Sequence, residues 1–426
     1  MDTRGSVVIV GLNYAPETTG IAPYTSALAR GLAARGWRVR VITTHPHYPS
    51  WTLPAAAPWS EDATVDGVRV SRRRHFVPRR PRGVLRLLSE VSFGLRAVTA
   101  RWGRADVVVL VSPSLFASAM AILRLRLTGQ RTPVLTWIQD LYSLGITETG
   151  QGSSRVAAAM ARVESWTVRQ SDVVAVIHDR FRDHVLSELG GFEDSTAVVR
   201  NWTHLADRPP VDRRAVRHRL GWSDSDVVVV HAGAMGVKQG LSNVIDAAEL
   251  AASRSSAVRF VMIGGGSQRA ALVASAHGVP TIEILDSLPD EEFQAALQAA
   301  DVLLVNEKPG VAGMAVPSKL TSYFNAARPV VAATDPGSVT ESEVRRAGAG
   351  VVVPAGDPVA LVVALEALGS DPAHADELGR SGLAFRREFL AEERAIDGYA
   401  RILADLRRGA SAHARRANDS STQGTH

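Results

Sequence analysis

The chain has 426 residues, of which 46% are hydrophobic and 21% charged, and its formal net charge is +5. This length and composition predict a globular protein with two or three domains, each with a sizeable core. The sequence contains no Cys, which excludes disulfides, Cys-ligated zinc, iron–sulfur clusters and thiol nucleophiles. The first apolar run is too short for a signal peptide, and Asp106, Ser112 and Pro113 interrupt the longest apolar tract, so no leader and no membrane span is expected.

Short β-branched runs alternate with helical segments along the chain, starting with VVIVG at 7–11 and the helical pattern at 20–36. The runs are almost continuously apolar, which is typical of parallel strands covered by helices on both faces. One group of runs precedes residue 205 and a second group follows residue 225. The pattern predicts an α/β fold with two doubly wound parallel sheets.

The alternation pauses at 201–216, where Pro209 and Pro210 stand among charged residues, as in a linker. We therefore expect an N-terminal domain over 1–205 and a C-terminal domain over 206–389. The helical segment 390–408 is able to pack back on the first domain. The tail 409–426 lacks apolar periodicity and is expected to be disordered.

Three loops in the second half follow apolar runs and open helices, where unpaired N–H groups favour a phosphate. The residues with the backbone freedom or the charge for this role are Gly233, Gly236, Lys238, Gly240, Gly264, Gly265, Gly266, Pro317, Ser318 and Lys319. Lys319 falls in the first turn of a helix, where the dipole disfavours a cation unless an anion lies nearby. The chain has only one other lysine, Lys308, which we expect in a solvated loop. The pattern predicts a diphosphate site.

Three phrases, GLNYAPETTGIAPYTSALARGL, GAMGVKQGL and PSKLTSYFNAARPVVA, together resemble the GT-B glycosyltransferases of the retaining family 4. They look closest to the subgroup that makes colanic acid and O-antigen. The resemblance covers nearly all of the chain before the tail. It implies two Rossmann-like domains that face a cleft, with the acceptor held by the first domain and the nucleotide sugar by the second.

The resemblance also assigns roles to single residues. It implies catalytic roles for Glu17, Lys238 and Lys319, and a donor-side role for Gly20, the glycine loops, Pro317, Ser318 and Leu320. Asp140 is a further catalytic candidate because it is a polar residue at the end of an apolar run. It implies acceptor contacts by Thr19, His45, His47, Tyr48 and Asn201. Two departures leave the ribose contact undefined: the paired glutamates of the family would fall at Met314 and Ser322, and its phosphate-loop arginine at Ala234.

The implied reaction transfers a sugar, expected to be a UDP-linked HexNAc or a related sugar, to a lipid-linked or glycan acceptor of cell-surface polysaccharide synthesis. No protein nucleophile, metal or other cofactor is expected. An Arg-rich segment, Arg69–Arg86, leads into a helix with apolar residues at Val84, Leu87, Leu88, Val91 and Leu95. This combination predicts contact with an anionic membrane, and hence a cytoplasmic protein at the inner membrane face. Nucleic acid is not an expected partner.

Alternatives remain at this point. A UDP-sugar 2-epimerase-like GT-B enzyme shares the expected fold, and an inactive sugar-nucleotide-binding partner subunit is compatible with the missing glutamates. The Arg-rich segment is also compatible with a solvated face over an ordinary core helix. An oxidoreductase is disfavoured, because the first strand–helix turn lacks GxGxxG.

Overall fold

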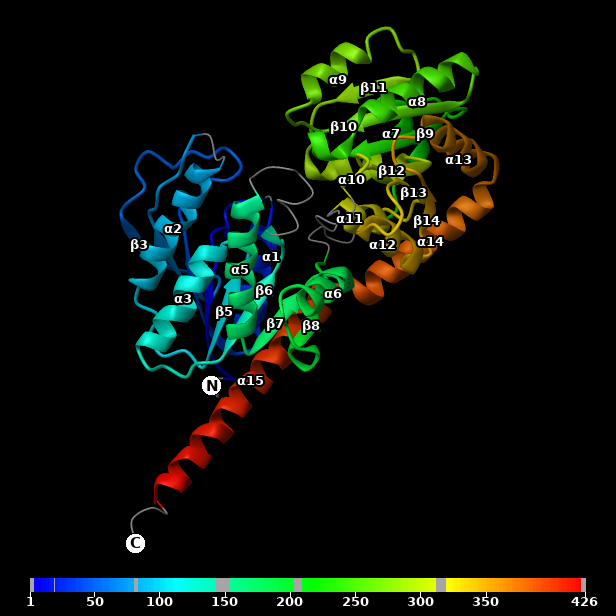
Figure 1. The fold of residues 1–426 in the computed structure, drawn as a ribbon. Helices are drawn as coiled ribbons and strands as arrows, with labels where there is room; N and C mark the ends of the chain where they lie inside the picture. The colour runs from blue at the N-terminus through cyan, green and yellow to red at the C-terminus, as the bar shows by residue number, and fades with distance from the viewer. Residues whose placement is uncertain are drawn as a thin grey trace. The chain divides into compact units, whose positions relative to one another are not determined.

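The computed structural model describes residues 4–18, 20–79, 83–142, 154–202, 209–311 and 319–422 (Figure 1). The chain divides into two compact units. Unit 1 comprises Met1–His204 and Glu392–His426, and unit 2 comprises Leu205–Ala391. Each unit has its own sheet, and the predicted α/β class with two parallel-sheet domains is confirmed.

The sheet of unit 1 has the strand order β3-β4-β2-β1-β5-β6-β7-β8. Its strands are β1 (Gly5–Val10), β2 (Trp37–Thr43), β3 (Ser60–Val65), β4 (Val68–Arg73), β5 (Val107–Val111), β6 (Val134–Ile138), β7 (Val173–Val176) and β8 (Thr196–Val198). All neighbouring pairs are parallel except β3 and β4. The order reverses between β1 and β5, which makes their carboxyl ends the topological switch point of this unit.

Helices cover both faces of this sheet. They are α1 (Ala22–Ala34), α2 (Val84–Val98), α3 (Leu115–Leu127), α5 (Ser154–Gln170), α6 (Asp179–Ser187) and α15 (Glu392–Thr422). Phe93 of α2 and Ala117 of α3 share a buried core with Val8 and Val10 of β1. Alternate side chains of one strand point to opposite faces, so the other residues of β1 face the opposite side of the sheet.

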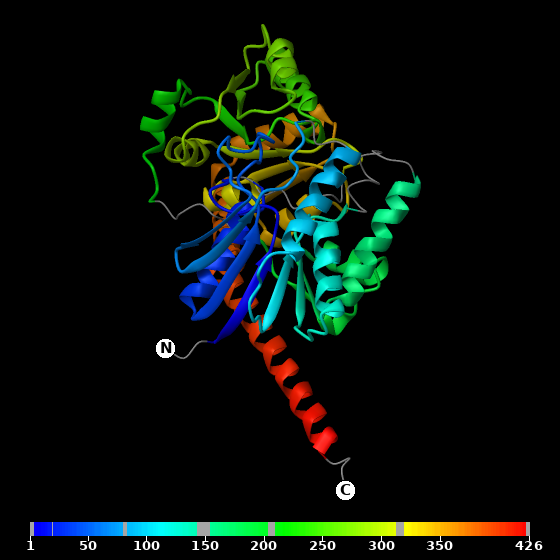
Figure 2. The same cartoon turned by 90° about the vertical axis from the view of Figure 1, so that its left-hand side faces the viewer.

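Helix α15 returns to unit 1 after unit 2 is complete. A Cβ built on Gly31 of α1 would lie 2.4 Å from Ile396 Cδ1, so the absence of a side chain at Gly31 lets the two helices touch. Tyr399 packs against Trp137 with ring centroids 4.9 Å apart. Figure 2 shows α15, in red, continuing beyond the sheet of unit 1. Helix α15 is drawn as far as Thr422, in a segment whose Ala and Arg have high helix propensity; the expectation of a disordered tail over 409–426 stays a prediction.

The sequence reading missed the strands β3 and β4, which form an antiparallel hairpin at the edge of the sheet. Their turn is Asp66-Gly67, with both residues at positive φ, a common hairpin turn. The Arg-rich segment therefore begins inside a strand. Arg72 donates from Nη1 to Thr44 O at 3.0 Å, and Arg73 pairs with Asp62 at 3.2 Å, so part of its positive charge is used within the unit.

Helix α2 packs against α3 through a small residue and exposes several large apolar side chains. A Cβ on Gly94 would lie 2.7 Å from Met120 Sδ and 3.1 Å from Ala117 Cα, so α3 approaches α2 closely there. The solvent-facing residues, which we call the α2 stripe, are Val84 (70% exposed), Leu85 (43%), Leu88 (49%) and Leu95 (54%). No helix within the described ranges combines the length and apolarity needed to cross a bilayer.

The sheet of unit 2 is fully parallel in the order β11-β10-β9-β12-β13-β14. Its strands are β9 (Val227–Ala232), β10 (Val258–Ile263), β11 (Ile282–Leu285), β12 (Val302–Asn306), β13 (Val330–Ala333) and β14 (Gly350–Val353). Its helices are α7 (Arg213–Leu220), α8 (Ser242–Ser253), α9 (Arg269–Ser275), α10 (Asp290–Ala299), α11 (Lys319–Asn325), α12 (Val339–Ala347), α13 (Pro358–Ser370) and α14 (Pro372–Phe389). Val228 and Val230 face the α10–α11 core, whereas Val229 faces the α8–α13 core.

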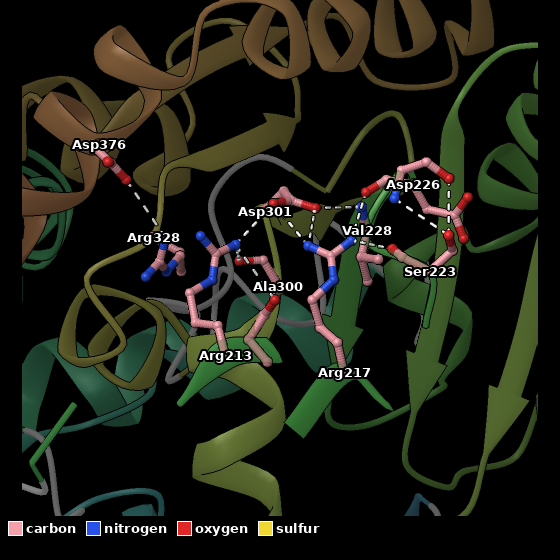
Figure 3. Close-up of polar contacts among 11 residues, drawn as sticks. Arg213, Arg217, Ser223, Asp226, Val228, Ala300, Asp301, Arg328 and Asp376 are labelled. Atoms are coloured by element: carbon pink, nitrogen blue, oxygen red, sulfur yellow. Dashed lines mark hydrogen bonds and ion pairs between the residues drawn. The ribbon is translucent and has the colours of Figure 1, made fainter. Parts of the chain in front are cut away.

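An ionic network ties β9 and β12 together at their amino ends (Figure 3). Asp301, just before β12, accepts the backbone N–H of Val228 at 2.7 Å. It also pairs with Arg213 at 2.8 Å and with Arg217 at 3.0 Å, both on α7. This network holds the two central strands together at their amino ends, away from the carboxyl ends where a ligand is expected.

Candidate functional site

The strand order of unit 2 reverses between β9 and β12, so the crevice at their carboxyl ends is the expected ligand position in a sheet of this kind. The loop at Gly233–Gly236 follows β9, and the loop at Gly264–Gly266 follows the neighbouring β10. Glu307 follows β12, and Lys319 begins α11. Structure and sequence agree that the glycine loops and Lys319 belong to one end of one sheet.

Glycine is required where the two loops touch. Gly264 has φ +141°, and a Cβ there would lie 2.1 Å from Gly233 O. Gly266 has φ +150°, and its Cβ would lie 2.5 Å from Met235 O. The backbone N–H of Met235 donates to Gly265 O at 2.8 Å. The loops are thus pressed together, while a Cβ on Gly265 would meet nothing within 4 Å and the backbone there is open to a ligand.

The loop that carries Lys238 is held by contacts with the backbone of Lys308 and by a hydrogen bond within the loop. Gly240 has φ +55°, and a Cβ there would lie 2.8 Å from Lys308 Cα. The Gln239 side chain accepts the N–H of Gly236 at 3.0 Å, and the N–H of Lys308 donates to Lys238 O at 2.8 Å. Lys238 itself is exposed, and so is the side chain of Lys308, although its backbone supports the loop.

Lys319 is the cation at the centre of the carboxyl end of this sheet. Its Nζ lies 3.2 Å from Nε2 of His231, the penultimate residue of β9. Its Cε would be 3.9 Å from a Cβ on Gly233, so the lysine lies against the first glycine loop. Leu320 is 2% exposed in the core, so any contact of Leu320 with a donor can come only from its backbone.

Burial and neighbouring charges set the ionisation of this group. Burial lowers the pKa of Lys319 to about 8, and the charge of Glu307 opposes the shift. Burial also raises the pKa of Glu307, whose carboxylate accepts hydrogen bonds from Thr334 and, at 2.6 Å, from Thr340. The pKa of His231 is well below its usual value because of burial and the adjacent Lys319. A negative ligand would favour the charged form of Lys319.

In unit 1, Glu17 joins the loops after β1 and β2. Its Oε1 accepts the N–H of His47 at 2.8 Å and the N–H of Tyr48 at 2.9 Å. Its Oε2 accepts from Asn13 Nδ2 at 2.8 Å. The carboxylate is buried, so the geometry gives Glu17 a structural role, and its catalytic role stays a prediction.

The predicted acceptor residues His45 and His47 are both buried at the carboxyl end of β2. His45 Nε2 lies 2.9 Å from Pro58 O. His47 Nε2 has no hydrogen-bond partner within the described residues, and neither ring nitrogen of the adjacent His75 has one. The rings of His47 and His75 lie 5.0 Å apart, and burial lowers the pKa of His75 to about 3. These orphaned nitrogens are compatible with an acceptor hydroxyl.

Two further predicted residues follow β6 and β8. Asn201 donates from Nδ2 to Gln139 Oε1 at 2.7 Å. Within the described chain, Gln139 Nε2 and Asn201 Oδ1 are buried without partners. Asp140 is exposed next to Gln139, and its N–H donates to Ser112 Oγ at 3.2 Å. The structure thus brings Asn201 to Gln139 and Asp140 at one end of the sheet of unit 1.

Some predicted residues are not described. Thr19, Pro317 and Ser318 lie outside the described ranges. Gly20 has φ +64°, and a Cβ there would lie 3.3 Å from Tyr48 Cε1, so it sits against the loop after β2. Within the described ranges, His, Asp and Glu side chains do not gather in a group that could hold a metal ion; the expectation of a metal-independent site stays a prediction.

Three residues of the site escaped the sequence reading. His231 and Glu307 are polar residues at the end of apolar strands, the same signal that singled out Asp140. His75 carries no such signal, because the strand β4 that precedes it is itself Arg-rich.

Family models and relatives identify the class of protein. Residues 19–202 match a glycosyl transferase 4-like domain, and residues 226–371 match the glycosyl transferases group 1 model. The chain is 30% identical over 332 residues to a putative colanic acid biosynthesis glycosyl transferase of Escherichia coli K12, covering 75% of this chain and 80% of the relative.

Solved structures share the fold. A sucrose-phosphate synthase of Thermosynechococcus elongatus is 17% identical with a TM-score of 0.72, covering 94% of this chain and 99% of its own. Anabaena HepE in complex with UDP is 13% identical with a TM-score of 0.67, covering 94% and 100%. The two sheets are thus those of a GT-B fold, and the chain belongs to the group 1 glycosyltransferases, with a glycosyl transferase 4-like first domain.

Proposed function

We propose that this enzyme is a retaining glycosyltransferase of the colanic-acid and O-antigen subgroup. It moves a sugar from a nucleoside diphosphate sugar, expected to be a UDP-linked HexNAc or a related donor, to a lipid-linked or glycan acceptor of cell-surface polysaccharide synthesis. The observation that carries the proposal is the half-buried Lys319 beside the Gly233 loop, at the switch point of unit 2. A diphosphate is the ligand that this combination of cation and open backbone suits.

The chemistry follows from where charge develops. The bond between the anomeric carbon and the diphosphate breaks, and negative charge grows on the leaving phosphate. Lys319, Lys238 and the backbone N–H groups of the glycine loops stabilise that charge, which is the largest single contribution in such sites. The acceptor oxygen bonds to the anomeric carbon on the same face, and its proton passes to the leaving phosphate. No protein nucleophile is needed.

The relatives support the class of substrate. The Escherichia coli relative is named for colanic acid biosynthesis, and the Anabaena structure holds UDP. We carry both to this chain as part of the proposal. We also propose, from the chain's own lysines and backbone N–H groups, that the reaction needs no metal.

We further propose that unit 1 binds the inner membrane face through the α2 stripe and nearby arginines. Val84, Leu88 and Leu95 recur at helical spacing and are exposed, and Arg69, Arg79 and Arg86 are exposed in the same Arg-rich segment. Apolar side chains flanked by positive charge favour an anionic lipid surface. A lipid-linked acceptor would be reached at that surface.

Calorimetric titration with UDP, GDP and their sugars tests the donor, followed by turnover with polyprenyl-diphosphate-linked acceptors. Lys319→Ala and Lys238→Ala should each weaken diphosphate binding about tenfold or more. Lys308→Ala is the matched control, because its side chain is exposed and only its backbone supports the loop. Unchanged affinity in both site variants contradicts the proposed site.

The same assays separate the alternatives. Formation of an epimer from a UDP-sugar without acceptor would identify an epimerase instead. Nucleotide binding with no turnover of any sugar or acceptor would identify an inactive partner subunit.

A further inference from the structure

The strands β9 and β12 separate at their carboxyl ends. Their ladder pairs Val229 with Val302 and Val230 with Leu303 and then stops, although β9 continues to Ala232. Two side chains take over the backbone groups left there. Tyr323 Oη accepts the N–H of Ala232 at 2.8 Å and lies 3.2 Å from Leu304 O. His231 Nδ1 also lies 3.2 Å from Leu304 O.

This contact assigns the proton on His231. A carbonyl oxygen only accepts, so Nδ1 carries the hydrogen and donates to Leu304 O. The opposite nitrogen, Nε2, then presents a lone pair, and the group facing it at 3.2 Å is the Lys319 ammonium, which only donates. The ring stays neutral because burial and Lys319 hold its pKa low, although the carbonyls of Leu304 and Ala234 act in the other direction.

We propose that His231 is a positioning residue: its Nε2 holds the Lys319 ammonium against the Gly233 loop, ready for the diphosphate of the donor. The inference rests on the proposed function, because it assigns a second residue to that site. His231 does not contact the ligand itself. It fixes the end of a flexible four-carbon side chain, so that less conformational entropy is lost when the ligand binds.

Neighbouring groups fit this role. Gly233 has no side chain between Lys319 and the loop. Two titratable groups face Lys319 within the described part of unit 2: His231 from β9, and Glu307 after β12, whose charge favours the ammonium. Hydrogen bonds from Thr334 and Thr340 hold the Glu307 carboxylate. An uncharged acceptor at His231 therefore orients the cation without neutralising it, and the cation remains available to an anion.

Two substitutions divide the functions of the ring. His231→Asn retains a donor near the position of Nδ1, and thus the contact with Leu304, but removes the acceptor for Lys319. His231→Gln places an amide oxygen near the position of Nε2 and can still accept from Lys319. His277→Asn, an exposed histidine of the same unit, is the matched control. Thermal melting establishes that each variant is folded.

The readout is UDP affinity by calorimetry from pH 6.5 to 9.5, together with KM for the donor. Wild-type affinity should fall as pH rises through about 8, where Lys319 loses its proton. His231→Asn should weaken binding about tenfold at pH 7 and move this fall to lower pH, because the ammonium has lost an acceptor. His231→Gln should stay within about threefold of wild type, as should His277→Asn.

The outcomes are distinguishable. Wild-type protein that binds no nucleoside diphosphate refutes the proposed function and this inference with it. Weak binding by Lys319→Ala, with unchanged affinity and an unchanged pH midpoint in His231→Asn, refutes the inference alone. If His231→Asn does not fold, His231→Gln decides: a folded Gln variant that loses affinity as strongly as Lys319→Ala overturns the positioning role, and a Gln variant with wild-type affinity and pH midpoint supports it.

Discussion

The carboxylate of Glu17, in the loop after β1, accepts the backbone N–H of His47, in the loop after β2, at 2.8 Å. The same oxygen accepts the N–H of Tyr48 at 2.9 Å. One buried side chain therefore sets the positions of the two loops that follow β1 and β2, including the segment predicted to meet the acceptor.

Glu17→Gln should destabilise the protein. One carboxylate oxygen becomes an NH2 group that faces a donor, either Asn13 Nδ2 or the backbone N–H groups, and a buried donor is left without an acceptor. We expect a loss of about 1–3 kcal/mol in the free energy of unfolding, measured by urea denaturation. Glu188→Gln, at an exposed glutamate, is the control. A large fall in kcat with unchanged stability would instead support the catalytic role predicted for Glu17.

Gly264→Ala should disrupt the paired glycine loops. The new Cβ would lie 2.1 Å from Gly233 O, at a φ of +141°. We expect a loss of more than about 2 kcal/mol in unfolding free energy and weaker nucleotide binding. Gly265→Ala provides a neighbouring comparison, because its Cβ meets nothing within 4 Å. Equal stability of the two variants would show that the loops are not in contact.

Glu90 should make stability depend on pH. It is 4% exposed, and burial raises its pKa to about 7, against the opposing effects of Tyr142 and Arg86. Between pH 4.5 and about 7 the folded state binds this proton and the unfolded state does not, so its contribution to stability is lost as pH rises through that window.

Glu90→Gln removes the titration and leaves a neutral group of the same shape. At pH 8 the variant should be more stable than wild type, and the advantage should shrink toward pH 5. Urea denaturation of both proteins at each pH measures the difference. A stability difference that is constant across the range would contradict the raised pKa.

The α2 stripe should be required for lipid binding. Leu88→Glu places a charge where the proposal puts lipid, so the fraction bound to phosphatidylglycerol vesicles should fall about tenfold. Leu127→Glu on α3 replaces a leucine that is 78% exposed outside the stripe and should bind as wild type does. Wild-type binding should also weaken with added salt. Equal binding of the two variants would exclude the stripe as the docking surface.

Much of the fold follows from the sequence because it depends on local patterns. The continuous apolar runs such as VVVLV at 107–111 predicted parallel strands covered on both faces, and the strands lie there. The hairpin β3–β4 escaped because all six residues of β3 are exposed, so no apolar pattern marks that strand. The sequence predicted that the site contains glycines and lysines in the loops after strands. It could do so because backbone freedom and charge are properties of single residues.

Only the tertiary structure decided which of these residues meet and in what state. Lys319 and His231 are 88 residues apart, and no local pattern pairs them; the packing of α11 against β9 brings them together. The apolar stripe of 84–95 was compatible with either a membrane contact or a core face, and the close contact of Gly94 with α3 leaves Leu88 and Leu95 exposed. The sequence by itself determined the apolar strands, the glycine loops and the cations. Burial, which changes the pKa of a group and the partners of a hydrogen bond, arises only when distant segments pack, and therefore belongs to the folded structure.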